Sequence, residues 1–163
     1  MAVQLSLGSN LGVRRENLEA ALAALGQLPE TSLTRRSRIY ETEPYGVTEQ
    51  PDFLNMAVEI ETGLQPLELL EAIKRIEHRL GRQHTEHWGP RNIDIDIVLW
   101  GDWVLETDRL TVPHPDYRRR AFVLIPLAEI VPEAVDPITG MTVAQLAAQP
   151  GLQGRVRRLD AGD

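Results

Sequence analysis

Two acidic residues alternate with isoleucine in the segment Ile93-Asp94-Ile95-Asp96-Ile97. On an extended strand the isoleucines share one face and the two carboxylates share the other, roughly 6.5–7 Å apart along the strand. Aspartate is disfavoured inside strands, and two like charges on one face repel each other unless water or a cation separates them. Because Mg²⁺ prefers hard oxygen ligands, the pattern indicates a magnesium site at Asp94 and Asp96, with a solvated strand face as the alternative.

Arginines surround this segment in the sequence. Arg82 and Arg91 precede it, and Arg109 and the run at 118–120 follow it. Guanidinium groups bind phosphate oxygens through paired N–H donors, so together with a metal these residues could form a nucleotide-phosphate site. A solvated charged surface is the alternative. A P-loop is excluded, because the Gly-Lys-Ser/Thr sequence that it requires does not occur.

Histidines and aromatic residues allow further interpretations. His84 and His87 could bind a metal together with His114, which would make the chain a His/Asp metallohydrolase, although no H-E-x-x-H pattern is present. Phe53 and Phe122 could stack on a flat ring, or they could simply fill the core.

Composition bounds the class of protein. A chain of 163 residues, 42% of them hydrophobic, is long enough for one domain with a core. The absence of cysteine excludes disulfides, thiolate zinc sites and a catalytic thiol. The net charge of −7 argues against a protein that coats nucleic acid. Neither a signal peptide nor a long apolar stretch is recognisable, so we expect a cytoplasmic protein without a membrane segment, and we expect a monomer.

Periodicity places the polar residues on structural elements. It predicts a strand at 3–7, a helix at 18–25, two strands at 32–42 and 54–61 on either side of a long loop, a helix at 66–80 and a strand at 93–99. This βαββαβ order fits an α+β, ferredoxin-like sandwich, in which an antiparallel sheet carries its helices on one face. We expect C-terminal additions: a short strand at 104–105, a helix near 118–130, a helical turn within 142–148 and an edge strand at 155–159. Such a fold could also serve as a nucleic-acid- or metal-binding module.

The segment HWGPRNIDIDIV at 87–98 resembles the signature of the 6-hydroxymethyl-7,8-dihydropterin pyrophosphokinases, enzymes of the folate pathway. The resemblance extends to LGSN at 7–10, YETEPYGVTEQPDFLN at 40–55, RIEHRLGR at 75–82 and RLTVPHPDYRRRAFVLIPLAEI at 109–130.

The resemblance implies an enzyme that transfers pyrophosphate from ATP to the hydroxymethyl group of the pterin and releases AMP. It implies that Asp94 and Asp96 hold two magnesium ions and that Arg82 and Arg91 clamp the phosphates. The implied ATP contacts are Glu77, Arg82, Trp88, Arg91, Arg109, Thr111, His114 and Arg120. The implied pterin contacts are Thr42, Pro44, Tyr45, Phe53, Asn55 and Phe122.

Overall fold

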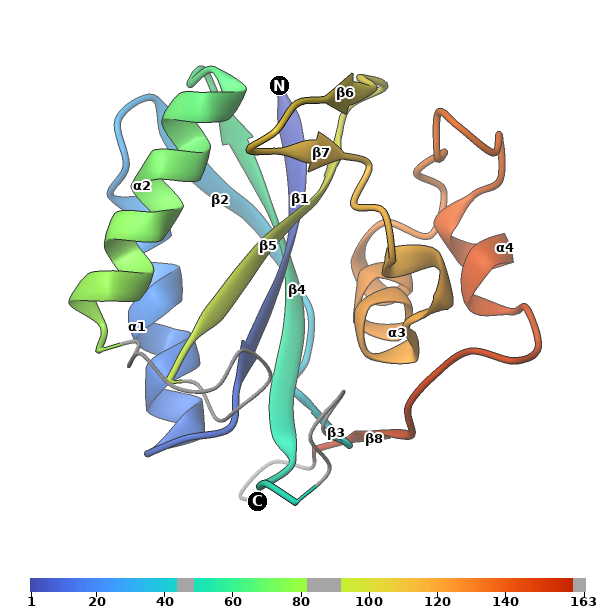
Figure 1. Ribbon diagram of the computed structural model, residues 1–163, viewed down its shortest axis with the longest axis horizontal. Coiled ribbons are helices and arrows are strands. Elements are labelled where there is room, and N and C mark those ends of the chain that lie inside the picture. Colours follow the sequence, from blue (N-terminus) through green and yellow to red (C-terminus); the bar gives the residue numbers. More distant parts are fainter. Residues whose placement is uncertain (44–48, 82–91, 160–163) are drawn as a thin grey trace.

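An antiparallel sheet with helices on both faces forms the centre of the molecule (Figure 1). The computed structural model describes residues 1–43, 49–81 and 92–159. Its strands are β1 (Ala2–Ser9), β2 (Thr31–Arg36), β3 (Tyr40–Thr42), β4 (Phe53–Thr62), β5 (Asp94–Trp100), β6 (Leu105–Glu106), β7 (Thr111–Val112) and β8 (Val156–Arg158). Its α-helices are α1 (Arg14–Gly26), α2 (Pro66–Arg79), α3 (Ala121–Ile130) and α4 (Val143–Ala147), and a short 3₁₀ helix spans Tyr117–Arg119.

The strand order in the sheet is β5-β1-β4-β3-β8, with β2 also paired to β4 and every pair antiparallel. The strand predicted at 32–42 is divided in two. β2 pairs with the second half of β4, and β3 pairs with its first half. At the break, the Ser37 backbone N–H donates to the Ala57 carbonyl, and the Ser37 hydroxyl accepts from the Ala57 N–H. The chain therefore bends at Ser37 while it stays bonded to β4.

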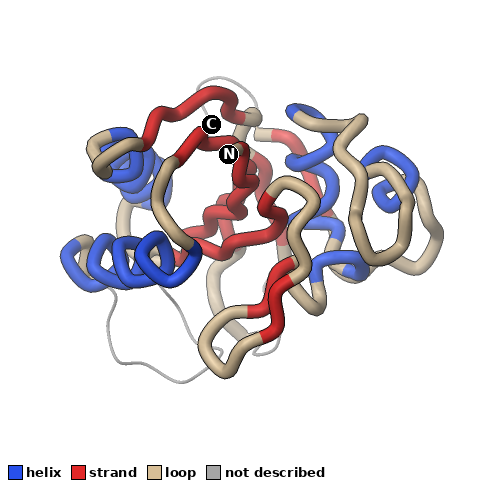
Figure 2. Tube along the Cα trace, turned by 90° about the horizontal axis from the view of Figure 1, so that it is seen from above, coloured by secondary structure: helices blue, strands red, loops and turns tan. Residues whose placement is uncertain are grey.

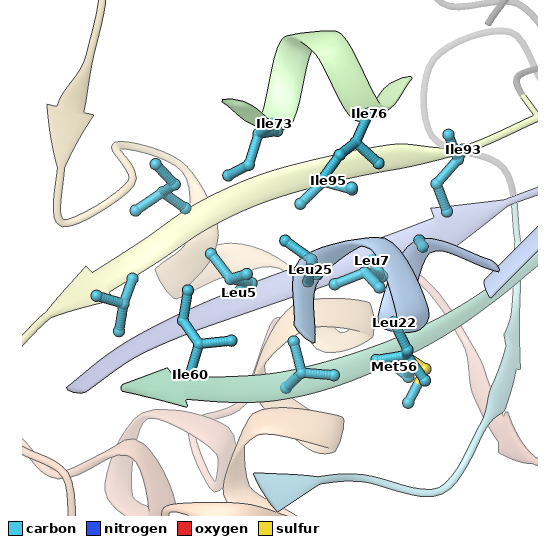
Figure 3. Packing of buried hydrophobic residues seen from close by; sticks show 14 of the residues in the cluster. Leu5, Leu7, Leu22, Leu25, Met56, Ile60, Ile73, Ile76, Ile93 and Ile95 are labelled. Carbon is cyan, nitrogen blue, oxygen red and sulfur yellow. The ribbon is translucent and has the colours of Figure 1, made fainter. Parts of the chain in front are cut away.

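The main core lies between the sheet and the helices α1 and α2 (Figure 3). Leu18, Leu22 and Leu25 recur at helical spacing, so α1 presents one apolar face to the sheet. Helix α2 begins at a proline and a capping box formed by Gln65 and Glu68, which satisfy N–H groups at the helix start. Both helices thus lie on one sheet face, as predicted.

The third helix, predicted near 118–130, is present as α3. It begins at 121, after the 3₁₀ turn, and it covers the opposite sheet face rather than the face of α1 and α2 (Figures 1 and 2). The reason is its sequence, AFVLIPLAEI, which is apolar on nearly all sides and is therefore buried between two partners. Val123, Leu124 and Leu127 belong to a second buried cluster, which also contains Ala57 of β4 and Leu146 of α4.

The C-terminal additions are attached through one buried carboxylate. Asp136 is fully buried, and its Oδ2 accepts hydrogen bonds from the Tyr117 hydroxyl and from Arg118 Nε, each at 2.5 Å. Its Oδ1 accepts the backbone N–H groups of Ile138 and Thr139. None of the helices in the described ranges has the length and apolar character needed to cross a membrane.

Candidate active site

The two aspartates of β5 lie half-buried on the sheet face opposite the isoleucine core. In the register, Asp94 is paired with Gly8 of β1, and Asp96 is paired with Ser6. Alternation along β5 sends Ile95 into the core and leaves both carboxylates on the side of α3. The structure therefore brings both predicted metal ligands to one face of an edge strand of the described sheet.

The carboxylate of Asp96 is electrostatically unfavourable in its ionised form. Burial raises the pKa of Asp96 to about 7, and the negative charges of Asp94 and Glu77 add to this effect. The positive charges of Arg120 and Lys74 act in the opposite direction without cancelling it. A divalent cation against the two carboxylates would relieve the repulsion, and carboxylate oxygens are ligands that Mg²⁺ prefers. The donor set at this edge therefore fits magnesium.

Glu77 supports the strand that carries the aspartates. This residue of α2 is only 2% exposed, and its Oε2 accepts the backbone N–H of Ile95 at 2.9 Å. A strand at the sheet edge has N–H groups without a neighbouring strand, so a buried carboxylate is an effective partner for one of them. The prediction that Glu77 also contacts a nucleotide stays a prediction.

Three of the residues proposed to bind the pterin lie together on the central strands. Asn55 of β4 is paired with Gly8 on one side and with Tyr40 on the other, and Phe53 is paired with Thr42. The Asn55 amide is buried, and its Nδ2 donates to the Thr42 hydroxyl at 2.5 Å. This bond fixes the orientation of the amide, so Thr42 positions Asn55.

Gly8 makes room for that amide. A Cβ atom at position 8 would lie 2.6 Å from Asn55 Oδ1 and 3.4 Å from Phe53 Cδ1. Since real Cβ atoms do not approach an oxygen so closely, any larger residue would displace Asn55. Gly8 thus lies between the two parts of the site, because its partner on β4 is Asn55 and its partner on β5 is Asp94.

Phe122 and Arg120 enter the site from the start of α3. Phe122 packs against the cluster that contains Ala57, so it lies on the same sheet face as the aspartates. The guanidinium carbon of Arg120 is 5.6 Å from the centroid of the Phe122 ring, and Arg120 is 9% exposed. A nearly buried arginine beside an aromatic ring can present a fixed positive charge to an anion.

The segment after β5 contributes the other described candidates for ATP binding. His114 is tied to β5 by its backbone N–H, which donates to the Val98 carbonyl at 2.9 Å. Its Nδ1 accepts the Asp116 N–H at 3.1 Å, so the neutral ring carries its proton on Nε2 and can donate there. Burial, followed by the charge of Arg120, lowers the pKa of His114 and favours this neutral form.

Thr111 and Arg109 are less closely associated with the aspartates. Thr111 is half-buried on β7, the second strand of the small β6–β7 ribbon. Arg109 is exposed, and its Nη1 is 3.3 Å from Oε1 of Glu71 on α2. Their nucleotide contacts stay predictions.

Several predicted site residues lie outside the described ranges: Pro44, Tyr45, Arg82, Trp88 and Arg91, together with His84 and His87 of the metallohydrolase hypothesis. Among residues 1–43, 49–81 and 92–159, no group of three or more His, Cys, Asp or Glu side chains is arranged to hold a metal ion. The described residues therefore give the metallohydrolase hypothesis no support.

Asn10, directly after β1, and Arg14, the first residue of α1, were not predicted to have a role. The Asn10 side chain, 1% exposed, donates to the Gln50 side chain at 2.9 Å and to the Pro51 carbonyl at 3.0 Å. Arg14 Nη1 donates to the Asp52 carbonyl at 2.8 Å. These hydrogen bonds from Asn10 and Arg14 hold the segment before Phe53 in place. The signal available in the sequence was an asparagine directly after Gly-Ser at the end of a predicted strand, within the LGSN motif.

Most of the chain is similar to proteins of one family. The family model of 7,8-dihydro-6-hydroxymethylpterin-pyrophosphokinase (HPPK) matches residues 4–132. The chain is 44% identical over 133 residues to the 2-amino-4-hydroxy-6-hydroxymethyldihydropteridine pyrophosphokinase of Haemophilus influenzae, covering 82% of this chain and 83% of that protein. The protein of the same name from Bacillus subtilis is 51% identical over 126 residues, covering 77% of this chain and 75% of that one.

Solved structures agree in fold. The wild-type HPPK-DHPS of Plasmodium falciparum, solved with pterin and p-hydroxybenzoate, superposes with a TM-score of 0.71 at 18% identity. The match covers 90% of this chain but 41% of that chain, so this chain spans less than half the length of the solved protein. At this level of identity the likeness concerns the fold alone.

Proposed function

Because this chain belongs to the 7,8-dihydro-6-hydroxymethylpterin-pyrophosphokinase family, we propose that it transfers pyrophosphate from ATP to 6-hydroxymethyl-7,8-dihydropterin and releases AMP. The observation that carries the proposal is the pairing across β5, β1 and β4, which aligns Asp94, Gly8 and Asn55 on one sheet face. A phosphate-binding edge and a pocket for a flat ring would then be neighbours. This arrangement suits transfer between two bound substrates.

On the ATP side, Asp94 and Asp96 would hold two magnesium ions, which would neutralise phosphate oxygens and stabilise the charge on the transferred group. Arg120 adds a positive charge that acts on Asp96 across the same face. His114 offers an Nε2–H donor, and Arg109 and Thr111 lie on the segment that leads to it. Glu77, Arg82, Trp88 and Arg91 complete the proposed set of ATP contacts.

On the pterin side, the rings of Phe53 and Phe122 would stack on the two faces of the heterocycle, while Asn55 would bond its edge. Asn55 suits this role because Thr42 holds its amide in one orientation. Thr42, Pro44 and Tyr45 are the remaining proposed contacts.

The chain's own contribution to the reaction would be orientation and charge rather than covalent catalysis. Holding the hydroxymethyl oxygen in line with the β-phosphorus converts a bimolecular encounter into a step within one complex. Fixed positive groups that point at the moving negative charge lower the barrier without reorganising during the reaction. No residue is assigned as general base.

The strand order supports a finer description of the fold. The core strands β1, β2 with β3, β4 and β5 alternate with α1 and α2 in the order βαββαβ, and they lie in the sheet as β5-β1-β4 followed by β2 and β3. We infer a ferredoxin-like core, to which the segment from β6 onward is added. A cytoplasmic location and a monomeric state stay predictions.

The proposal is tested by the pterin dependence of ATP consumption. ATP should be consumed with Mg²⁺ only when 6-hydroxymethyl-7,8-dihydropterin is present. Asp94→Asn and Asp96→Asn should each lower turnover at least about 100-fold, because each removes a metal-binding charge. Asp102→Asn, in the exposed turn after β5, is the matched control and should keep normal turnover. Near-normal turnover of either site variant at saturating Mg²⁺ would refute the assigned role.

A further inference from the structure

A second charged site lies away from the aspartates. A cavity of about 570 Å³ opens beside the bend between β2 and β3. Among the described residues, four arginines line it, namely Arg15, Arg36, Arg38 and Arg158, with Glu129 as the acidic lining residue. This concentration of positive charge contrasts with the net charge of −7 of the whole chain.

Several elements bring these arginines together. Arg15 belongs to the first turn of α1, and Arg36 and Arg38 flank Ser37, where the edge strand bends. Arg158 belongs to β8, which pairs with β3 and lies beside it in Figure 1. In that register Arg158 is opposite Tyr40, whose hydroxyl binds Glu129 of α3. The tertiary structure therefore brings the arginines together, since they do not come from one charged face of a single helix.

The existing contacts leave positive charge available in the cavity. Arg36 is engaged, since its two terminal nitrogens lie 2.8 and 3.2 Å from the Glu19 carboxylate. Glu129 is engaged as well, because it accepts the Tyr40 hydroxyl at 2.5 Å and the Arg38 backbone N–H at 3.0 Å. In the part of the chain that the structure describes, the guanidinium groups of Arg38 and Arg158 form no hydrogen bond or ion pair.

Arg38 and Arg158 both line this one cavity, and both act electrostatically on the Tyr40 hydroxyl. Burial, followed by Glu129, raises the pKa of Tyr40 to about 12. The charges of Arg158 and Arg38 both act on this hydroxyl in the opposite direction. Two guanidinium groups that line one cavity can bind one anion between them.

The cavity is separate from the aspartate site. The aspartates are on β5, and the cavity adjoins β3, three strand positions away in the sheet. With neighbouring strands about 4.8 Å apart, this separation is about 14 Å. A phosphate bound at Asp94 and Asp96 therefore does not reach Arg38.

We propose that this cavity is a second anion-binding site that takes a small diphosphate, either inorganic or carried on an organic group. Guanidinium forks match phosphate oxygens in geometry, and two such forks from different segments suit two linked phosphates better than one. The volume falls within the range of small-molecule sites, which is roughly 300–1,000 Å³. Ile39 and Leu159, which also line the cavity, provide an apolar surface for an organic group.

The test uses the full chain with EDTA and without nucleotide, so that magnesium does not draw diphosphate to the aspartates. Inorganic pyrophosphate is titrated calorimetrically, followed by orthophosphate and by ADP as an organic diphosphate. We expect pyrophosphate or ADP to bind at least about tenfold more tightly than orthophosphate, since two forks are engaged. Amide NMR signals of residues 36–39 and 158–159 should shift on binding.

The variant Arg38→Ala/Arg158→Ala should lose at least about tenfold in affinity for the tighter-binding diphosphate. The matched control Arg75→Ala/Arg79→Ala removes the same charge from the exposed side of α2 and should bind as the unaltered chain does. Equal affinity in the two double variants would overturn the proposal. It would also be overturned by the absence of binding at millimolar pyrophosphate and ADP, or by shifts confined to the surroundings of Asp94 and Asp96.

Discussion

Asp96 is the residue at which the needs of folding and of function oppose each other. Its pKa lies at about 7 because burial, Asp94 and Glu77 all disfavour the charged carboxylate. A protein selected for stability alone would place a neutral side chain there. A metal site explains why Asp94 and Asp96 lie together, because a bound cation is attracted by the same negative charge that disfavours folding.

Asp96→Asn should therefore alter how stability depends on pH. Between about pH 4 and pH 7 the unfolded chain releases this proton before the folded chain does, so the contribution of Asp96 to the free energy of unfolding falls as pH rises. Asparagine does not ionise, so the variant does not lose this part of the free energy of unfolding as pH rises. Without divalent cations, Tm of the variant should exceed Tm of the unaltered chain at pH 8, and the difference should shrink toward pH 4. Thermal melts of both proteins and of Asp102→Asn check this, and parallel curves across the range would contradict it.

Gly8→Ala should selectively impair pterin binding. The new methyl group would lie 2.6 Å from Asn55 Oδ1, and this buried amide is held by Thr42 and cannot turn away freely. We expect pterin affinity to fall at least about tenfold and the free energy of unfolding to fall by about 1–3 kcal/mol, while affinity for an ATP analogue changes little. Fluorescence titrations and urea unfolding measure these quantities.

Gly26→Ala is the matched control for that substitution. A Cβ at this position, the end of α1, has no atom within 4 Å, so binding should be unchanged and the free energy of unfolding should rise by about 0.4–1 kcal/mol rather than fall. Normal pterin affinity in Gly8→Ala would show that Asn55 can move, and it would remove Gly8 from the site.

At the residue scale, the local pattern indicated the aspartate pair and the family resemblance implied the pterin contacts, but neither assigned a role to Gly8, Asn10 or Arg14. The alternation of Asp94 and Asp96 with isoleucine is visible in the sequence, because strand geometry turns it directly into one acidic face. The role of Gly8 depends on which residue of β4 lies opposite it, and register between distant strands is not encoded locally. The hydrogen bond from Asn55 to Thr42 was unpredictable for the same reason.

The contact between α2 and β5 decides how firmly the aspartate strand is held. Glu77→Ala would leave the buried N–H of Ile95 without its acceptor, which costs about 1–3 kcal/mol in the free energy of unfolding. Glu77→Gln keeps a carbonyl oxygen that can accept, so it should cost less. Glu71→Ala, on the same helix and exposed, is the control. Denaturant unfolding ranks the three variants, and equal stability of Glu77→Ala and Glu71→Ala would contradict this role.

At the element scale, the helices and strands of the core could be predicted because their apolar periods are clear. The spacing of Leu18, Leu22 and Leu25 defines α1, and Pro66 marks the start of α2. The face that α3 covers could not be predicted in this way. An almost wholly apolar helix has no polar side to orient it, so only its tertiary partners determine its position.

At the scale of the whole molecule, the sheet separates two kinds of surface. Hydrophobic packing with α1 and α2 occupies one face, and the residues proposed to meet substrate occupy the other, where α3 covers only part of the strands. The segment after the family match, from 133 onward, is secured by Asp136 and by the pairing of β8 with β3. Burial alone would raise the pKa of Asp136, but bonds from Arg118 and Tyr117 hold it below its usual value.

The central claim concerns which bond of ATP is attacked, and the products report it directly. The chain is incubated with ATP, Mg²⁺ and 6-hydroxymethyl-7,8-dihydropterin, and the quenched mixture is analysed by mass spectrometry and ³¹P NMR, with Asp96→Asn as the inactive control. Attack on the β-phosphorus predicts AMP and the pterin diphosphate in equal amounts, both requiring the pterin. Formation of ADP with a pterin monophosphate, or AMP production that does not depend on the pterin, would contradict the account.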